Sequence, residues 1–434
     1  MRQVFIAALL AILAVGAFAE GQNEPTGSVI PYDPQQDYDI SIGLYGDLEV
    51  AYRAVFALPS FKRQFPFVNI NFQTSDFAGH HNRLTVVLGA DEVTNEIEAI
   101  EIAYIAQFVS GRGLTDLSAE PFDGGEAADA LVDFAVSNVT TSDGRLVAMP
   151  VDVAPVVLFY REELARASGV TPEEIQNIAD WDEFIEIGER LTRDTDGDGE
   201  IDQWAIAHAN DIALVGLNGG KTGWFNEAGE PLQPQERFMD SLNTVMQARN
   251  AGIDADMGVF SGPGMSALSD GTVVMLPWGS WYGGALREFV APNVEDWRVA
   301  YLPGRQSATI GGTFLAIPDD VDPAKKDLAY QIIRFIATNP DAQRIIFRTI
   351  EAFPVLTDIY DDPIMNEPVE YFGGQRVRQI YADVAENMPV TPVNPGDPLV
   401  EGIWGSTVGL MLEGQLTPEE AYEQALNQVR ATVD

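Results

Sequence analysis

The chain has 434 residues, which is enough for two domains with sizeable cores. Its formal net charge of −41 excludes a nucleic-acid partner, because the acidic surface would repel a polyanion. Hydrophobic residues make up 46% and charged residues 21% of the chain, so the bulk composition is that of an ordinary globular protein.

Residues 1–19 predict a secretory signal peptide. Arg2 supplies the positive start, residues 4–15 are apolar, and residues 17–19 (AFA) form a small-x-small cleavage site. The apolar run is shorter than the roughly 20 residues that span a bilayer. The chain has no Cys, so the cleavage site lacks the residue that would carry a lipid. We therefore expect an exported, periplasmic protein that is not lipid-anchored, with residues 20–37 as a polar, Pro-rich, disordered leader.

After the leader, the hydrophobic pattern alternates between strands and helices. The first half predicts, in chain order, strand 38–45, helix 49–64, strand 67–73, helix 80–88, strand 97–102 and helix 103–110. The second half predicts strand 153–160, helices 162–167, 182–191 and 234–251, strands 272–276 and 297–302, and helices 325–338 and 419–433. This order implies an α/β fold with a mostly parallel sheet and helices on both faces.

Residues 194–202 (DTDGDGEID) match a calcium-loop pattern. The oxygen ligands at loop positions 1, 3, 5, 7 and 9 would come from Asp194, Asp196, Asp198, the backbone carbonyl of Glu200, and Asp202. Ala205 stands at position 12, where a calcium sensor has a bidentate Glu, and residues 203–207 alternate like a strand. We therefore expect a structural Ca²⁺ clip between a helix and a strand, with an acidic solvated turn as the alternative.

Several separated segments carry short motifs in a fixed order. They are residues 143–150 (DGRLVAMP), 157–164 (VLFYREEL), 181–184 (WDEF), 271–281 (GTVVMLPWGSW), 311–318 (GGTFLAIP) and 416–421 (LTPEEA). Their order and spacing resemble the extracellular solute-binding proteins (family 1) of ABC transporters, in the carbohydrate-binding branch that includes maltose-binding protein. Two departures concern the first segments: the family's usual Tyr before Gly is missing, and residues 159–161 read FYR in place of YNK.

The resemblance implies a type II-like periplasmic-binding-protein fold, with two α/β lobes and a ligand cleft between them. It places residues 38–150 plus 278–318 in lobe 1 and residues 151–277 plus 319–434 in lobe 2. It further implies that the lobes close around a neutral sugar or polyol, which is delivered to the transmembrane subunits of an ABC permease. We expect a monomer that is not an enzyme and needs no cofactor for its function. The alternative is an exported carbohydrate-active enzyme resembling a glycoside hydrolase, although no pair of carboxylates stands out.

A sugar site needs aromatic rings for the C–H faces and polar groups for the hydroxyls. In an open α/β sheet, ligands bind beyond the carboxyl ends of the strands. We therefore expect ligand contacts from strand ends, predicted crossovers and lobe edges, at Tyr45, Asp47, Asp76, His81, Glu101, Tyr104, Asp152, Trp278, Ser280, Trp281, Gly311, Gly312, Thr313, Tyr371 and Trp404. Residues 311–313 would offer backbone amides. Two alternatives stay open: Trp281 as a core residue, and Glu101 as a first-turn acid stabilised by the helix dipole.

Overall fold

The computed structural model describes residues 30–90, 95–109, 113–218, 223–226, 228–390 and 393–433. The predicted signal peptide and the first part of the leader lie outside these residues. The described part of the leader packs against the body of the protein: the Tyr32 N–H donates to Asp327 Oδ2 at 3.3 Å, and the Tyr32 ring lies 5.6 Å from that of Phe67. These contacts contradict the expected disorder for residues 30–37.

A mixed sheet runs through the molecule in the order β2-β1-β3-β7-β4-β5, and β6 and β8 pair with β4. Its strands are β1 (Tyr38–Tyr45), β2 (Val68–Ser75), β3 (Ile97–Glu101), β4 (Met149–Arg161), β5 (Met275–Gly279), β6 (Trp297–Ala300), β7 (Thr309–Ala316) and β8 (Phe353–Pro354). The α/β class is confirmed, but the sheet is not mostly parallel. Among the strands that the structure describes, β1–β2 and β1–β3 are the parallel pairs, and β7 runs back between β3 and β4 and makes antiparallel pairs with both.

Strand β4 belongs to both halves of the molecule. Its first half pairs with β7 and β8, and its second half, from Val156, pairs with β5 and β6. Every residue of β4 except Arg161 is buried. The β4–β7 register shifts twice, once between Pro150 and Asp152 and once between Val153 and Pro155. These irregularities bend the ladder at the point where β4 passes from one half to the other.

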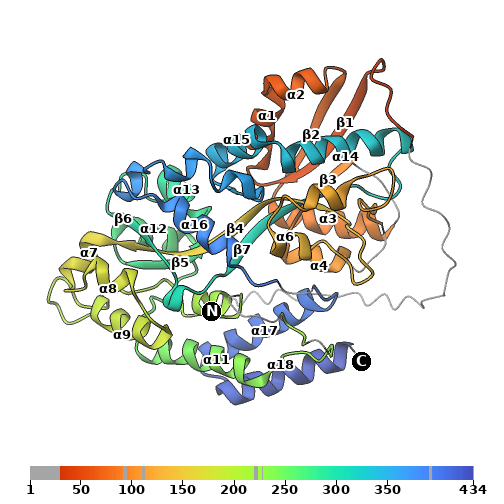
Figure 1. The fold of residues 1–434 in the computed structure, drawn as a ribbon. Helices are drawn as coiled ribbons and strands as arrows, with labels where there is room; N and C mark the ends of the chain where they lie inside the picture. The colour runs from red at the N-terminus through yellow and green to blue at the C-terminus, as the bar shows by residue number, and fades with distance from the viewer. Residues whose placement is uncertain are drawn as a thin grey trace, which may run out of the picture.

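Helices surround this sheet in two groups (Figure 1). The first group, with α1, α2, α14 and α15 at the top of that view, contains α1 (Leu48–Ala57), α2 (Pro59–Gln64), α3 (Phe77–Gly89), α4 (Ile102–Val109), α5 (Gly124–Ala128), α6 (Asp133–Ser137), α14 (Pro323–Thr338), α15 (Pro340–Ile350) and α16 (Val377–Glu386). The second group, with α11, α17 and α18 at the bottom of that view, contains α7 (Glu162–Ala167), α8 (Pro172–Gln176), α9 (Trp181–Leu191), α10 (Asn210–Asn218), α11 (Gln235–Asn250), α17 (Asp397–Leu412) and α18 (Pro418–Val433). Helices α12 (Gly262–Asp270) and α13 (Tyr282–Ala285) flank β5. No helix among the described residues is long and apolar enough to cross a membrane.

Most predicted helices form with small shifts in their ends. Helix α9 begins as expected, since the Asp180 side chain accepts a hydrogen bond from the Glu183 N–H. The helix predicted over residues 49–64 is broken into α1 and α2 at Pro59, which starts the second helix because it has no N–H to continue the first. Residues 203–207 make isolated bridges rather than a strand.

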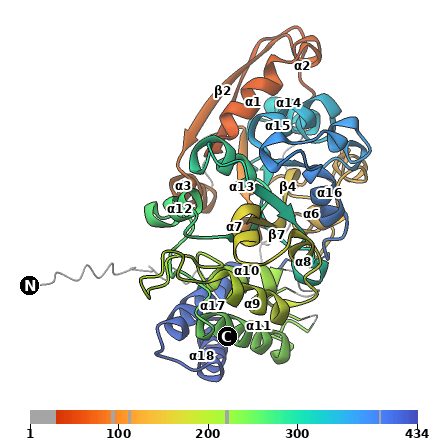
Figure 2. The same ribbon diagram turned by 90° about the vertical axis from the view of Figure 1, so that its left-hand side faces the viewer.

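The apolar side chains form two main cores. The first contains residues from β1, β3, α1 and α14–α16, such as Ile40, Val55 and Ile333, and the second contains residues from α9, α11, α17 and α18, such as Phe184 and Leu242. Figure 2 shows α9, α11, α17 and α18 together at the lower end of the molecule. The predicted lobe 2 grouped all of residues 319–434, whereas α14 packs on β1 and β4, and α15 packs on α1. An amphipathic helix does not reveal from sequence which core its apolar face will meet.

Candidate functional site

Three neighbouring strands bring three predicted ligand residues into one row. Thr313 on β7 is the cross-strand partner of Glu101 on β3 and of Asp152 on β4. The Thr313 N–H donates to Asp152 Oδ1 at 3.0 Å, so this amide is already bonded and is not offered to a ligand as expected. The Tyr45 hydroxyl, from the end of β1, lies 3.0 Å from Thr313 Oγ1. Tyr45 and Glu101 end their strands, whereas Asp152 and Thr313 lie inside β4 and β7, and the four residues together form a polar centre.

Aromatic rings from α3 and α4 cover one side of this row. The His81 ring stacks on Tyr104 with centroids 4.1 Å apart and planes 12° apart, and it lies 4.9 Å from the Tyr45 ring. The Glu101 N–H donates to His81 Nε2 at 3.1 Å, so the other ring nitrogen, Nδ1, carries the proton and donates to the Phe77 carbonyl at 2.7 Å. Burial lowers the pKa of His81 to about 4, and the imidazole is therefore neutral. It contributes an aromatic face rather than a charge.

The carboxyl groups at the site are protonated more readily than ordinary acids. Burial, together with the charge of Glu401 on α17, raises the pKa of Glu101 to about 8, and burial raises that of Asp152 to about 7. Burial also raises the pKa of Glu401 itself. None of the three forms an ion pair with a Lys or Arg in the described part of the chain. Near neutral pH such groups can both donate and accept hydrogen bonds, which suits hydroxyl partners.

A second aromatic group follows β5. The Trp281 Nε1–H donates to the Ile310 carbonyl at 2.8 Å, and the Ser280 N–H donates to the Pro155 carbonyl at 2.8 Å. Gly311 has φ +108°, and a Cβ there would lie 3.2 Å from both Trp281 Nε1 and the Ala154 Cβ. Glycine at 311 therefore lets the indole ring pack closely on β7. Trp281 is half-buried, so part of its ring stays available.

Several buried polar atoms near this second group have no hydrogen-bond partner within the described structure. Ser280 Oγ and Trp278 Nε1 are two of them. A third is Oδ2 of Asp211, in the first turn of α10. Burial and, after it, the charge of Asp211 raise the pKa of Tyr282. Burial raises the pKa of Asp211 itself to about 8. Such atoms cost free energy when unpaired, so they are suited to hydrogen bonds with a polar ligand.

Four other predicted residues have different surroundings. The Asp76 carboxylate caps α3 by accepting from the Gly79 N–H at 2.9 Å, and Asp47 is exposed before α1. The Trp404 ring is buried in the second core, 5.2 Å from that of Phe238. Tyr371 donates to the Ala291 carbonyl at 3.0 Å.

Tyr371 lies at the other end of β4 from the polar row. The Arg161 charge acts on its pKa, and Arg161 is nine residues along β4 from Asp152, or about 30 Å. The structure therefore brings together Tyr45, Glu101 and Asp152 but separates Tyr371 from them. The sequence shows that residue 371 is aromatic, but it does not show which end of β4 the ring lies near.

Sequence reasoning missed Glu401, Asp211 and Phe260. The charge of Glu401 acts on the pKa of Glu101 because α17 packs against α4, a contact between residues almost 300 positions apart in the chain. In a chain with 66 Asp and Glu residues, no local signal distinguishes the functional carboxylates. Phe260 precedes α12 and carries an exposed ring that stacks on Trp281.

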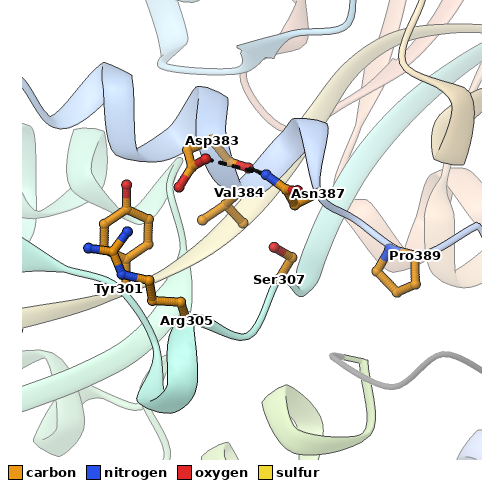
Figure 3. A pocket seen from close by; sticks show the side chains of 7 residues that line it. All are labelled: Tyr301, Arg305, Ser307, Asp383, Val384, Asn387 and Pro389. Carbon is orange, nitrogen blue, oxygen red and sulfur yellow. Dashed lines mark hydrogen bonds between the residues drawn. The ribbon is translucent and has the colours of Figure 1, made fainter. Parts of the chain in front are cut away.

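A pocket of about 400 Å³ opens between the β6–β7 connection and the end of α16 (Figure 3). It is lined by Tyr301, Arg305, Ser307, Asp383, Val384, Asn387 and Pro389. The Arg305 guanidinium lies 4.3 Å from the centroid of the Tyr301 ring, and the Asn387 amide donates to the Asp383 carbonyl at 2.7 Å. None of the predicted ligand residues lines this pocket.

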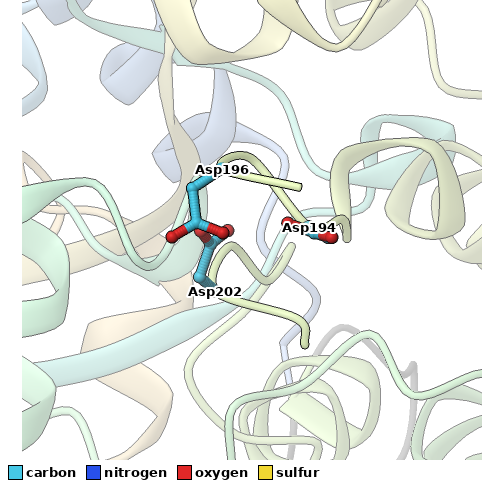
Figure 4. Close-up of side chains that lie close together, drawn as sticks. All are labelled: Asp194, Asp196 and Asp202. Atoms are coloured by element: carbon cyan, nitrogen blue, oxygen red, sulfur yellow. The ribbon is translucent and has the colours of Figure 1, made fainter. Parts of the chain in front are cut away.

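The predicted calcium loop folds back on itself after α9. An antiparallel bridge between Arg193 and Gln203 closes it, and Trp204 then bridges Val273 next to β5. The side chains of Asp194, Asp196 and Asp202 lie close together (Figure 4), and one carboxylate oxygen from each lies within 4.8 Å of the others. The loop therefore connects the end of a helix to the sheet region, as a clip would.

Of the four predicted side-chain ligands, one lies outside that cluster. The Asp198 carboxylate accepts from the Glu200 N–H at 2.8 Å and is not among the three grouped acids. The Asp194 carboxylate accepts from the N–H groups of Gly199 and Gly197 at 2.8 and 2.6 Å. These bonds lower the pKa of Asp194, so its negative charge is maintained.

Comparison with known proteins places this geometry in context. The sequence profile of the family described as "Bacterial extracellular solute-binding protein" matches residues 57–373. The chain is 25% identical over 262 residues to the lactose-binding protein of Rhizobium radiobacter, a match that covers 58% of this chain and 60%, less than two thirds, of that relative. It is 18% identical over 386 residues to the arabinooligosaccharide-binding protein of Bacillus subtilis (strain 168), covering 84% of this chain and 85% of the relative.

Solved structures share the fold. An extracellular solute-binding protein of family 1 superposes with a TM-score of 0.79 at 20% identity, covering 91% of this chain and all of the other. The ABC transporter associated binding protein of B. animalis subsp. lactis, solved with beta-1,6-galactobiose, gives a TM-score of 0.70 at 20% identity and covers 91% of this chain and 97% of the other. These similarities confirm the fold that the sequence motifs imply.

Proposed function

The chain belongs to the bacterial extracellular solute-binding proteins, and we propose that it binds a neutral sugar or polyol for an ABC importer. The observation that carries this proposal is the row of Glu101, Thr313 and Asp152 beside the rings of Tyr45 and His81. Carboxyl groups that donate and accept hydrogen bonds fit sugar hydroxyls, and aromatic faces fit sugar C–H faces. The names of the relatives, which bind lactose, arabinooligosaccharide and maltotriose, support the same ligand class.

The ligand would lie where the two cores meet. Glu401 from the second core faces Glu101 from the first, and both remain without a described basic partner. A sugar between them would give each carboxyl a hydroxyl partner and would favour the closed arrangement of the lobes. The closed, loaded form would then be recognised by the permease subunits. The protein would act as a monomer, free in the periplasm.

A ligand screen combined with a turnover assay tests this function. Thermal unfolding is measured with neutral mono- and oligosaccharides, with ribitol, and with sugar phosphates as negative controls. Binding stabilises the folded state by RT ln(1 + [L]/Kd), so at least one neutral sugar or polyol raises the melting temperature. The alternative, an exported glycoside hydrolase, would require two carboxyls flanking a glycosidic bond. Failure of every sugar and polyol to bind, or hydrolysis of a glycoside, contradicts the proposal.

We also propose that the loop of residues 194–202 binds Ca²⁺ as a structural ion. The grouped oxygens of Asp194, Asp196 and Asp202 support this proposal, because Ca²⁺ takes oxygen ligands in flexible geometry. The missing acid at Ala205 implies weak affinity, in the range of extracellular modules. Calorimetry in low salt tests it, and no heat of binding at Ca²⁺ concentrations above ~1 mM would contradict it.

A further inference from the structure

Phe260 is a large apolar side chain that is 59% exposed yet firmly held. Its ring plane is within 5° of that of Trp281, with centroids 6.1 Å apart. The rings of Trp278 and Tyr282 approach it edge-on at 5.6 and 5.8 Å. Three neighbouring rings therefore fix its orientation, and the exposed face is a constant feature of the surface.

The backbone around Phe260 is also fixed. The Tyr282 hydroxyl donates to the Val259 carbonyl at 3.4 Å, and the Met257 N–H donates to the Ala207 carbonyl at 2.9 Å. Ser261 caps α12, since its Oγ accepts from the Gly264 N–H at 3.0 Å. The exposure of Phe260 thus does not come from a loosely attached loop.

Trp281 links Phe260 to the polar row. The indole bonds to Ile310, which lies three residues along β7 from Thr313, or roughly 10 Å. The centroid of the Phe260 ring lies 6.1 Å beyond that of Trp281. Phe260 makes no described ring contact with Tyr45, His81 or Tyr104. The path from Thr313 through Trp281 to Phe260 is therefore longer than one sugar ring.

We propose that Phe260 is an outer stacking platform, and that the sugar bound by this protein is an oligosaccharide of at least three units that reaches it. This inference rests on the proposed sugar-binding function. The stacked, nearly parallel rings of Phe260 and Trp281 form one apolar aromatic group, which sugar C–H faces can cover. An inner unit would bond to the row at Asp152 and Glu101, a middle unit would lie against Trp281, and an outer unit would cover Phe260.

The dependence of affinity on the length of the oligosaccharide tests this inference. Calorimetry is carried out with maltose, β-galacto-oligosaccharide and arabino-oligosaccharide series of one to four units, on the wild type, Phe260→Ala, Phe260→Tyr and Phe289→Ala. Phe289 is the matched control, because it is 68% exposed and makes no described ring contact. In at least one series we expect wild-type affinity to rise from two units to three. Phe260→Ala removes that gain, about tenfold, equivalent to ~1.4 kcal/mol.

The remaining outcomes separate this inference from the function on which it rests. The affinities of Phe260→Ala for mono- and disaccharides stay within twofold of wild type, and Phe260→Tyr and Phe289→Ala keep the chain-length gain. Sugar binding that stops growing at two units, or that Phe260→Ala leaves unchanged at every length, overturns the outer platform alone. Absence of binding by every series and by the polyol overturns the proposed function, and the platform with it.

Discussion

Two acidic regions of this protein shift the pKa values of their carboxyl groups in opposite directions. At the row on β3, β7 and β4, burial raises the pKa of Glu101 and Asp152, and the neighbouring groups are aromatic. In the loop of residues 194–202 the acids are largely exposed, and backbone N–H groups lower the pKa of Asp194. The first region holds acids that exchange hydrogen bonds with a neutral partner, and the second holds charges that attract a cation.

The difference shows that acidic residue type is a weak guide to function in this chain. The role of each carboxyl group depends on how deeply it is buried and on which groups donate hydrogen bonds to it. A buried acid without a basic partner is costly unless something else compensates for it, whereas an exposed acid held by amides costs little. Four experiments break or sharpen this comparison.

The largest effect is expected at the aromatic side of the buried region. Trp281→Ala removes the half-buried ring that bonds to Ile310 and supports Phe260, so we expect sugar affinity to fall about 100-fold, or ~2.7 kcal/mol. Calorimetry with the sugar that gives the largest thermal shift measures the change. Phe289→Ala serves as the control. A loss below about threefold for Trp281→Ala would place the ligand elsewhere.

The second effect is a dependence of stability on pH. Glu101 and Asp152 hold their protons more tightly when folded than in the unfolded chain, where the carboxyl pKa is about 4. Between pH ~4 and ~8 the folded state therefore binds more protons, and the free energy of unfolding falls as pH rises, by ~1.4 kcal/mol for each unit by which folding raises a carboxyl pKa. Asp194 acts oppositely, because its depressed pKa means that its contribution is lost only as pH falls through the acid range.

Urea unfolding at several pH values, in high salt to screen the net charge, measures this slope. Glu101→Gln and Asp152→Asn keep the size of each side chain but remove its titration. In each variant the free energy of unfolding should therefore fall less steeply as pH rises. If the slope in both variants equals that of the wild type, the buried acids do not titrate in this window.

The third effect concerns the loop. At a Ca²⁺ concentration about ten times Kd, binding adds ~1.4 kcal/mol to the free energy of unfolding. Asp196→Ala removes one of the three grouped carboxylates and should abolish this gain. Asp198→Ala is the matched control, because its carboxylate lies outside the cluster, and it should keep most of the gain. Thermal unfolding with Ca²⁺ and with a chelator measures both, and equal behaviour of the two variants would contradict the assignment.

The smallest effect is the change in sugar affinity in Asp196→Ala. The loop follows α9 in the second core and makes no described hydrogen bond with the row at Asp152, so the affinity of the folded variant should stay within about twofold. Calorimetry at a temperature where the variant is fully folded tests this. A larger loss without unfolding would mean that the two acidic regions are coupled.

The part of the site that could be predicted from sequence is the part that strand ends determine. Tyr45, Glu101 and Asp152 stand where β-strands end or cross over, and the structure brings them together. Strand β7 is not predicted as a strand because its two glycines interrupt the hydrophobic alternation. The family motif nevertheless includes some of the same residues. Glu401 could not be found, because its role depends on how α17 packs against α4 rather than on any local pattern.

Grouping of the later helices failed for a related reason. The apolar face of α14 was predicted, but the face does not specify its partner, and α14 packs on β1 and β4 of the first core. Tyr371 was misplaced similarly, since sequence supplied an aromatic residue without the register that puts it near Arg161. Residue types and apolar helix faces could thus be predicted from the sequence, whereas the packing partners of distant elements could not.

Strand β4 has a consequence for how the protein comes apart. Its 13 residues supply hydrogen bonds to β7 and β8 at one end and to β5 and β6 at the other. Neither half can lose this strand without exposing the edge of its sheet. We therefore expect the two halves to melt together in one calorimetric transition, and the amides of β4 to be among the slowest to exchange with deuterium.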